Sequence, residues 1–153
     1  MENADILRKI RYTFDYSDDQ MMAIFADGGK PATRAQVSDW LKREDDPDHK
    51  GIYDIDLAVF LNGFITLKRG KRDGPMPKPE KTLNNNLILR KIKIALALRD
   101  DDMVDILKLA DLKVSKHEIS ALFRKETQSQ YRQCKDQFLR NFLFGMQKKY
   151  RKD

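Results

Sequence analysis

The feature that most constrains the fold is an internal repeat, in which each residue is compared with the one 82 places later. Leu7-Arg8-Lys9-Ile10 recurs as Leu89-Arg90-Lys91-Ile92, and Phe60-Leu61-x-Gly63 recurs as Phe142-Leu143-x-Gly145. From residue 3 to residue 70, 18 of 68 positions are identical at this displacement, without a gap. A register held over such a length is typical of a duplicated structural unit. We therefore expect two copies of one fold.

The repeat also predicts how the chain is divided. We place a first helical repeat at residues 1–69, a linker at 70–84 and a second helical repeat at 85–153. The linker is rich in Pro, Gly and Lys, and Pro75, Pro77 and Pro79 at alternate positions favour extended backbone. We hypothesise that the second repeat folds back against the first around an approximate twofold axis.

Apolar residues in both copies recur at helical spacing. The face of a first helix is marked by Ile6, Leu7, Ile10 and Phe14, and in the second copy by Ile88, Leu89, Ile92 and Leu96. We expect Asn3 and Asn85 to be the N-caps of these helices, because Asn is a favoured capping residue.

Three further helices are expected in each copy. Second helices begin at Asp18 and Asp100, and third helices follow the N-cap candidates Thr33 and Ser115. The fourth helices span residues 53–68 and 135–150, and no alternating strand pattern is present. The predicted fold is all-α, with two tandem four-helix repeats related by approximate twofold pseudo-symmetry.

Gly63 and Gly145 occupy equivalent places within the predicted fourth helices. Glycine inside a helix costs about 1 kcal/mol relative to alanine, so its recurrence favours a close helix crossing. We interpret both residues as part of the interface between the repeats. A seam between two copies of the chain is the open alternative.

Positive charge is concentrated in two places. The chain has 30 Lys and Arg against 24 Asp and Glu, a net charge of +6. Residues 66–82 carry +4 and residues 146–153 carry +3, so the remainder nets −1. Such clusters are typical of phosphate-binding surfaces, although cations at helix C-termini also complement the helix dipole. The candidate nucleic-acid-binding residues are Lys68, Arg69, Lys71, Arg72, Lys148, Lys149, Arg151 and Lys152.

Two function classes follow from this pattern. The first is a binding or adaptor module that contacts RNA or DNA non-specifically through the basic helix ends. The second is a protein–protein adaptor with no nucleic-acid role, whose anchors would be exposed aromatic side chains. The candidate anchors are Tyr12, Tyr16, Tyr131 and Tyr150.

A sequence-specific DNA reader is disfavoured. Residues 18–43 have the outline of a helix-turn-helix, but the turn is longer than usual. The outward face of the third helix would carry Asp39, which repels a phosphate backbone, and few donors for base edges.

No catalytic, cofactor-binding or metal-binding residue is predicted, and we expect no enzymatic activity and no cofactor. His49 and His117 have no partner at metal-ligand spacing, and Cys134 has no hydrolase signature around it. The acidic run 100–102 lacks the pattern of a calcium loop, and Gly28-Gly29 lacks that of a phosphate loop.

The sequence favours a cytoplasmic protein without a membrane partner. A single Cys excludes a disulfide framework within the chain. The first residues do not have the pattern of a secretory signal, and the longest apolar stretch, 57–67, is too short to span a bilayer.

As a set, several segments resemble the YehS family of small bacterial proteins: Leu83-Asn84-Asn85-Asn86, Lys42 to Asp46, Phe60-Leu61-Asn62-Gly63, Lys68-Arg69-Gly70-Lys71 and Asp136-Gln137-Phe138-Leu139-Arg140. The resemblance covers essentially the whole chain. It implies a bacterial, cytoplasmic, two-repeat protein and transfers no catalytic residue, because the family has no established activity. The chain departs from the family pattern at Ile52, where a Cys is expected, and at Lys135, where a Gly is expected.

Overall fold

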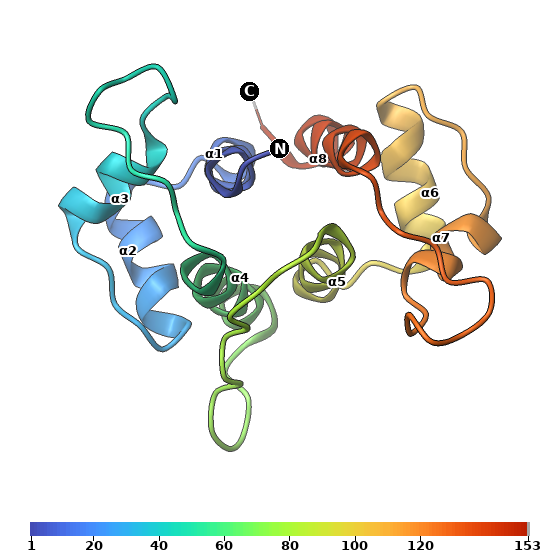
Figure 1. Ribbon diagram of the computed structural model, residues 1–153, viewed down its shortest axis with the longest axis horizontal. Helices are drawn as coiled ribbons and strands as arrows, with labels where there is room; N and C mark the ends of the chain where they lie inside the picture. The colour runs from blue at the N-terminus through green and yellow to red at the C-terminus, as the bar shows by residue number, and fades with distance from the viewer. Residues whose placement is uncertain (153) are drawn as a thin grey trace.

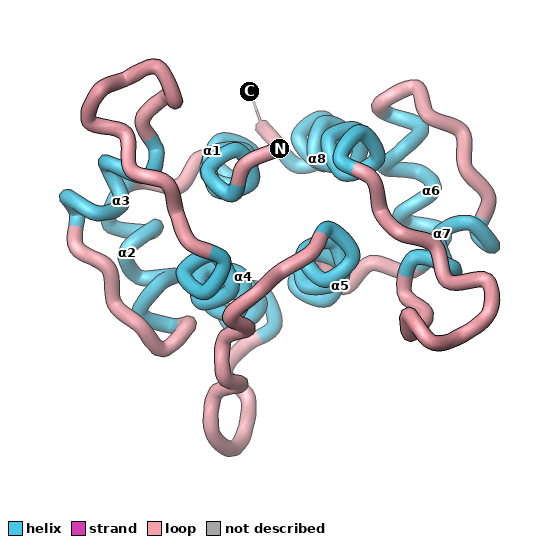
Figure 2. The backbone as a smooth tube through the Cα atoms, viewed as in Figure 1, coloured by secondary structure: helices cyan, strands magenta, loops and turns pink. Residues whose placement is uncertain are grey.

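The computed structural model describes residues 1–152, which form eight helices and no strand (Figures 1 and 2). The first four are α1 (Asn3–Phe14), α2 (Asp18–Asp27), α3 (Arg34–Leu41) and α4 (Asp54–Arg69). The second four are α5 (Asn85–Ala95), α6 (Asp100–Leu109), α7 (Lys116–Leu122) and α8 (Asp136–Tyr150). Each helix of the second set begins 82 residues after its counterpart. The predicted all-α fold of two four-helix repeats is confirmed. Within residues 1–152, no helix has the length and apolar character needed to cross a membrane.

The third helices begin as the sequence indicates. The side chain of Thr33 accepts a hydrogen bond from the backbone N–H of Gln36, and Ser115 accepts one from the N–H of Glu118. In each case the side chain three residues into the helix bonds back to the cap. These capping boxes satisfy backbone donors that have no partner within the helix.

The first helices begin one residue earlier than the predicted caps. Glu2 and Asn84 are the N-cap residues, and Asn3 and Asn85 are the first residues inside α1 and α5. The prediction that Asn3 and Asn85 are caps is therefore wrong. The reason is tertiary, because each amide side chain bonds to the start of the fourth helix of its own repeat instead of to its own helix.

Asn85 joins the start of α5 to the start of α8. Its Nδ2 donates to the backbone carbonyl of Cys134 (3.1 Å) and to Oδ1 of Asp136 (2.7 Å). Asn3 makes the same two hydrogen bonds 82 residues earlier, also at 3.1 and 2.7 Å. We call this arrangement the Asn–Asp clamp, and it is present once in each repeat.

The same two carboxylates connect the repeats. Oδ2 of Asp54 accepts a hydrogen bond from the backbone N–H of Leu83 (2.8 Å), and Oδ2 of Asp136 accepts one from the nitrogen of Met1 (3.1 Å). Positions 1 and 83, like positions 54 and 136, are 82 residues apart. Contacts that exchange in this way are those that a twofold axis between the repeats produces.

The centre of the molecule consists of α1, α4, α5 and α8, with α2 and α3 outside on one flank and α6 and α7 outside on the other (Figure 1). The starts of the four central helices meet through Asp54 and Asp136. At the opposite end, the ring of Phe14 lies 5.5 Å from that of Phe64 and 5.6 Å from that of Tyr150. The central helices therefore run in the same direction, and their C-terminal ends share one face of the molecule.

The predicted apolar faces form the core. Ile6, Leu7 and Ile10 are at most 2% exposed, and the equivalent residues of α5 are at most 3% exposed. Each such side chain contributes about 1.5–3 kcal/mol through burial. The two repeats are packed on each other, because α4 contacts α5 and α1 contacts α8.

Gly63 lies where α4 crosses α2. A Cβ at this position would be 1.8 Å from the carbonyl oxygen of Ile24. Gly145 lies where α8 crosses α6, and a Cβ there would be 2.1 Å from the carbonyl oxygen of Ile106. The predicted close crossing is present at both places. It lies within each repeat, however, so the interpretation of these glycines as repeat-interface residues is wrong. Close backbone approach is needed to pack the outer helices on the central ones.

Asn85→Ala is expected to lower the free energy of unfolding by about 1–3 kcal/mol, because it removes two hydrogen bonds and leaves the carbonyl of Cys134 without its amide donor. Urea unfolding followed by circular dichroism measures the change. Asn141→Ala is the matched control, since within residues 1–152 the Asn141 side chain accepts a hydrogen bond from Gln137 alone, at 3.2 Å. Equal effects of the two substitutions would show that the clamp adds no stability.

Candidate nucleic-acid interface

The two basic clusters are the C-terminal ends of α4 and α8, together with the residues that follow each helix. Because the central helices are parallel, both ends emerge on the same side of the molecule. We call this surface the basic face. The eight predicted nucleic-acid-binding residues belong to these two helix ends and the residues that follow them: Lys68, Arg69, Lys71, Arg72, Lys148, Lys149, Arg151 and Lys152.

Most of this charge is available to a ligand. Seven of the eight side chains are exposed, and Arg151 is half-buried. Apart from Arg151, none of them has a carboxylate of residues 1–152 within ion-pair distance. The C-terminal ends of α4 and α8 carry a partial negative charge that the cations partly offset. This partial charge is about −0.5 per helix end, so each basic cluster keeps a net positive charge.

Aromatic side chains lie between the two basic ends. The Lys68 ammonium stands 4.3 Å from the centre of the Phe14 ring, and Lys149 stands 5.6 Å from that of Tyr150. Phe14 and Tyr150 are in contact, and Tyr16 stacks on Phe14 at 5.7 Å. A chain of contacts thus leads from one basic end to the other across the end of α1.

Burial changes the protonation equilibria of this bridge. Partial burial lowers the pKa of the Lys68 ammonium and raises the pKa of the Tyr16 phenol to about 12. The pKa of Tyr150 is raised, chiefly by burial and also by the charge of Asp102. The phenols therefore stay neutral at pH 7 and carry no negative charge that would repel a phosphate.

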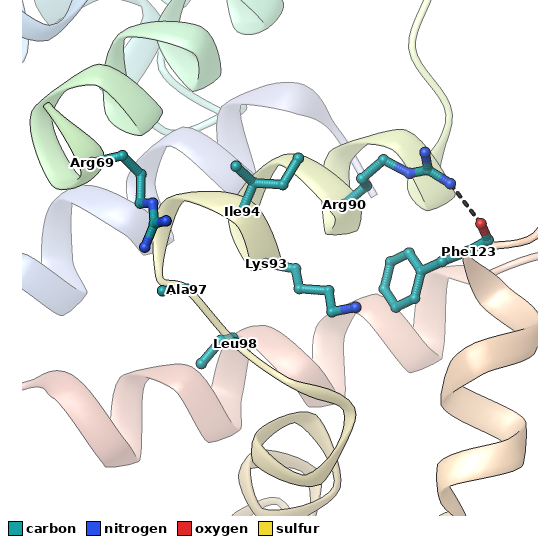
Figure 3. Close-up of a pocket in the computed structure, with 7 residues that line it drawn as sticks. All are labelled: Arg69, Arg90, Lys93, Ile94, Ala97, Leu98 and Phe123. Atoms are coloured by element: carbon teal, nitrogen blue, oxygen red, sulfur yellow. Dashed lines mark hydrogen bonds between the residues drawn. The ribbon is translucent and has the colours of Figure 1, made fainter. Parts of the chain in front are cut away.

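A pocket of about 490 Å³ opens where α4 ends beside α5 (Figure 3). Arg90 donates to the carbonyl of Phe123 (2.6 Å), and Lys93 lies 4.4 Å from the Phe123 ring centre and 3.2 Å from a carboxylate oxygen of Asp100. Arg69 reaches into the same pocket from α4. The lining contains three cations and no acid: Arg69, Arg90, Lys93, Ile94, Ala97, Leu98 and Phe123.

The equivalent place on the other side of the pseudo-twofold axis is filled. Arg151 is the counterpart of Arg69, and its guanidinium lies 3.7 Å from the ring centre of Tyr12 and donates to the Tyr12 carbonyl. The counterpart of Tyr12 is Ile94, which has no π face for a guanidinium. This difference leaves Arg69 unpaired among residues 1–152.

The other residues that carry reactive groups have structural surroundings. Cys134 is 2% exposed, and burial together with the charge of Asp136 raises its thiol pKa to about 11. Such a thiol is protonated at pH 7 and is a poor nucleophile. His117 is exposed and His49 is half-buried. No group of three or more His, Cys, Asp or Glu within the described part of the chain is arranged to hold a metal ion.

The acidic run at the start of α6 is accounted for by local contacts. Asp100 pairs with Lys93 (3.2 Å), Asp101 pairs with Lys116 (2.8 Å), and Asp102 accepts from the backbone N–H of Arg99 (2.8 Å). Lys42, which follows α3 in the segment with a helix-turn-helix outline, is likewise held by a local contact, because it pairs with Asp39 at 3.0 Å.

Comparison with known proteins places the chain in a family. The sequence profile described as "Protein of unknown function (DUF1456)" matches it twice, at residues 3–70 and 85–152. The chain belongs to this family. A DUF1456 repeat therefore corresponds to four helices, α1–α4 or α5–α8.

The chain is 41% identical over 147 residues to the "Uncharacterized protein YehS" of Escherichia coli (strain K12). The match covers 95% of this chain and 94% of that protein. The predicted YehS resemblance is thus confirmed. No solved structure matches.

Two members of the basic pocket were not among the predicted site residues of this DUF1456 chain. Arg90 and Lys93 belong to α5, where the sequence indicates only a mixed, solvated helix face. The spacing of Arg90 and Lys93 puts them on neighbouring positions of one helix face, but their approach to Arg69 depends on how α5 packs against α4.

Proposed function

We propose that this protein binds RNA or DNA non-specifically through the basic face. One observation carries the proposal: the basic ends of α4 and α8 lie on one side of the molecule, with Phe14, Tyr16 and Tyr150 between them. Basic ends at opposite poles would divide the charge between two surfaces. A shared face can contact successive phosphates of one strand.

The arrangement fits contact with the nucleic-acid backbone. Lys and Arg neutralise phosphates and release counterions, and this term does not depend on base sequence. Aromatic rings among cations provide surfaces on which bases of a single strand stack. Residues 56–64 of α4 are buried in the core, so this helix presents its basic end and no long exposed side that could lie in a major groove, and we expect weak discrimination between sequences.

The test is fluorescence anisotropy with a labelled single-stranded RNA, a single-stranded DNA and a duplex DNA of mixed sequence. We expect binding at about 50 mM salt, and a loss on the order of 10³-fold at about 200 mM if about six phosphates are contacted. Affinity that is unchanged by salt would contradict a phosphate-driven interface. Absence of binding at low salt would overturn the proposal and favour the protein–protein adaptor.

A further inference from the structure

A second cavity lies between α4, α5 and the linker that joins the repeats. Its volume is about 310 Å³, which is at the lower end of the range for small-molecule sites. Asn62, Ile65 and Thr66 line it from α4. The remaining lining residues come from the linker and α5: Arg72, Met76, Pro77, Glu80, Leu87, Arg90, Lys91 and Ile94.

Two buried polar side chains line this cavity. Asn62 is 4% exposed and Lys91 is 7% exposed. Nζ of Lys91 donates to Oδ1 of Asn62 (2.6 Å) and lies 3.0 Å from Oε1 of Glu80. Both groups that face the Lys91 ammonium are oxygen acceptors, which fixes the orientation of the Asn62 amide.

The other half of that amide has no partner. Nδ2 of Asn62 is buried and makes no hydrogen bond within residues 1–152. A buried amide N–H without an acceptor is unfavourable, and native structures rarely retain one. A ligand oxygen that reaches Nδ2 would supply the missing acceptor, and because this atom is buried, the side chains around it must move apart to admit the ligand.

The charge and the walls of the cavity define what fits. Arg72, Arg90 and Lys91 face a single acid, Glu80, so the lining has a net positive charge. Lys91 is already paired with Glu80, whereas Arg72 has no partner among residues 1–152. The walls between the polar groups are aliphatic: Ile65, Met76, Pro77, Leu87 and Ile94.

The pseudo-twofold axis places a second cavity, of about 420 Å³, at the equivalent position, but its polar lining differs. The counterpart of Asn62 is Phe144, and the counterpart of Lys91 is Lys9, which donates to Gln147 (2.7 Å). Burial lowers the pKa of Lys9 there, where no carboxylate is paired with it. The amide, the paired lysine and the linker that covers them occur together on one side only.

We propose that the cavity under the linker binds a small organic anion with an apolar body and one terminal carboxylate or phosphate. An anionic oxygen accepts from Nδ2 of Asn62 and is neutralised by Arg72, while Arg90, whose guanidinium donates to the Phe123 carbonyl, adds positive charge to the wall. The apolar body packs against the aliphatic walls. Asn62 is not part of the basic face, whereas Arg72 belongs to both surfaces, so the test that separates this site from nucleic-acid binding uses Asn62.

The test is an NMR titration of the ¹⁵N-labelled full chain with three probes that share one chain length: octanoate, octyl phosphate and octylamine. We expect a saturable shift of the Asn62 side-chain NH₂ signals with an anion and none with the amine. A larger affinity for octanoate assigns a carboxylate ligand, and a larger affinity for octyl phosphate assigns a phosphate ligand. Equal binding of octylamine, or an unmoved Asn62 signal with both anions, would overturn the proposal.

Asn62→Asp removes the free N–H, keeps the size of the side chain and leaves an acceptor for Lys91. We expect it to weaken anion binding about tenfold or more, because it also places a negative charge where the ligand's charge must lie. Asn141→Asp on α8 is the matched control and is expected to bind as the unchanged chain does. Arg72→Glu, at an exposed linker position, gives a second reading if Asn62→Asp unfolds the protein. Unchanged binding by both variants would contradict the site.

Two measurements separate this inference from the proposed function. Asn62→Asp is expected to leave nucleic-acid affinity and its salt dependence unchanged. Anion binding by a protein that fails to bind nucleic acid would support the cavity alone, and nucleic-acid binding without a shift at Asn62 would reject the cavity alone.

Discussion

Gly63→Ala is expected to lower the free energy of unfolding by about 3 kcal/mol or more, although alanine is the better helix former by about 1 kcal/mol. The added Cβ would stand 1.8 Å from the carbonyl oxygen of Ile24 and 2.9 Å from the nitrogen of Gly28. Both atoms are backbone, so no side-chain rotation relieves the overlap and α2 must move away from α4. For a chain of this length the melting temperature is expected to fall by about 6–12 °C in a thermal scan.

Two further glycine substitutions control this experiment. Gly51→Ala meets no atom within 4 Å and has no left-handed φ, so its effect is expected to stay within about 0.5 kcal/mol. Gly145→Ala places a Cβ 2.1 Å from the carbonyl oxygen of Ile106 and is expected to match Gly63→Ala. A neutral Gly145→Ala would show that the two helix crossings are not equivalent in the folded protein.

The helices were predictable because the duplication gives each pattern twice. Apolar spacing that is ambiguous in one copy is resolved by the residues 82 places away, and Thr33 and Ser115 are caps in both copies. The error at Asn3 and Asn85 has a physical origin. A cap bonds to its own helix, whereas these amides bond to carbonyls 49 residues away. Local sequence contains no sign of that distant acceptor.

The direction of the central helices was not predictable from the sequence. The spacing of apolar residues along a helix is the same whether the C-terminal ends of α4 and α8 share a face or lie at opposite ends of the molecule. The shared face depends on Asp54 and Asp136, whose carboxylates join the starts of helices from both repeats. The same contacts bring Lys91 beside Asn62 across the repeat interface, and so create a cavity that no sequence motif indicates.

The proposed anion cavity and the cationic pocket beside α5 both lie where the two repeats differ in sequence. Shared residues such as Gly63 and Asp54 hold the fold in both copies. In contrast, the counterpart of Asn62 in the second repeat is Phe144, and the counterpart of Ile94 in the first repeat is Tyr12. A duplicated fold needs only its common positions for packing, so the positions that diverge are free to form one cavity and one open cationic pocket.

Reversal of four charges on the basic face is expected to weaken nucleic-acid binding about 100-fold or more at about 50 mM salt, because each lost phosphate contact removes the free energy of counterion release. Each lost contact also lowers the slope of log affinity against log salt concentration by about 0.9. The variant carries Lys68→Glu, Arg69→Glu, Lys148→Glu and Lys149→Glu, and anisotropy titration measures its affinity. Circular dichroism verifies that the helices remain, since Lys68 also packs over Phe14.

A change in total charge alone would also weaken binding, and a second variant with four reversals elsewhere separates the two causes. Arg43, Lys50, Lys125 and Lys135 are exposed residues in or beside the loops that lead into α4 and α8. Their replacement by Glu changes the net charge equally but leaves the basic face intact, so only a modest loss is expected. Equal losses of affinity in the two variants would show that the net charge of the protein, and not the basic face, determines binding. If reversal at α4 alone and at α8 alone each weakens binding to the same strand, the two helix ends contact one ligand together.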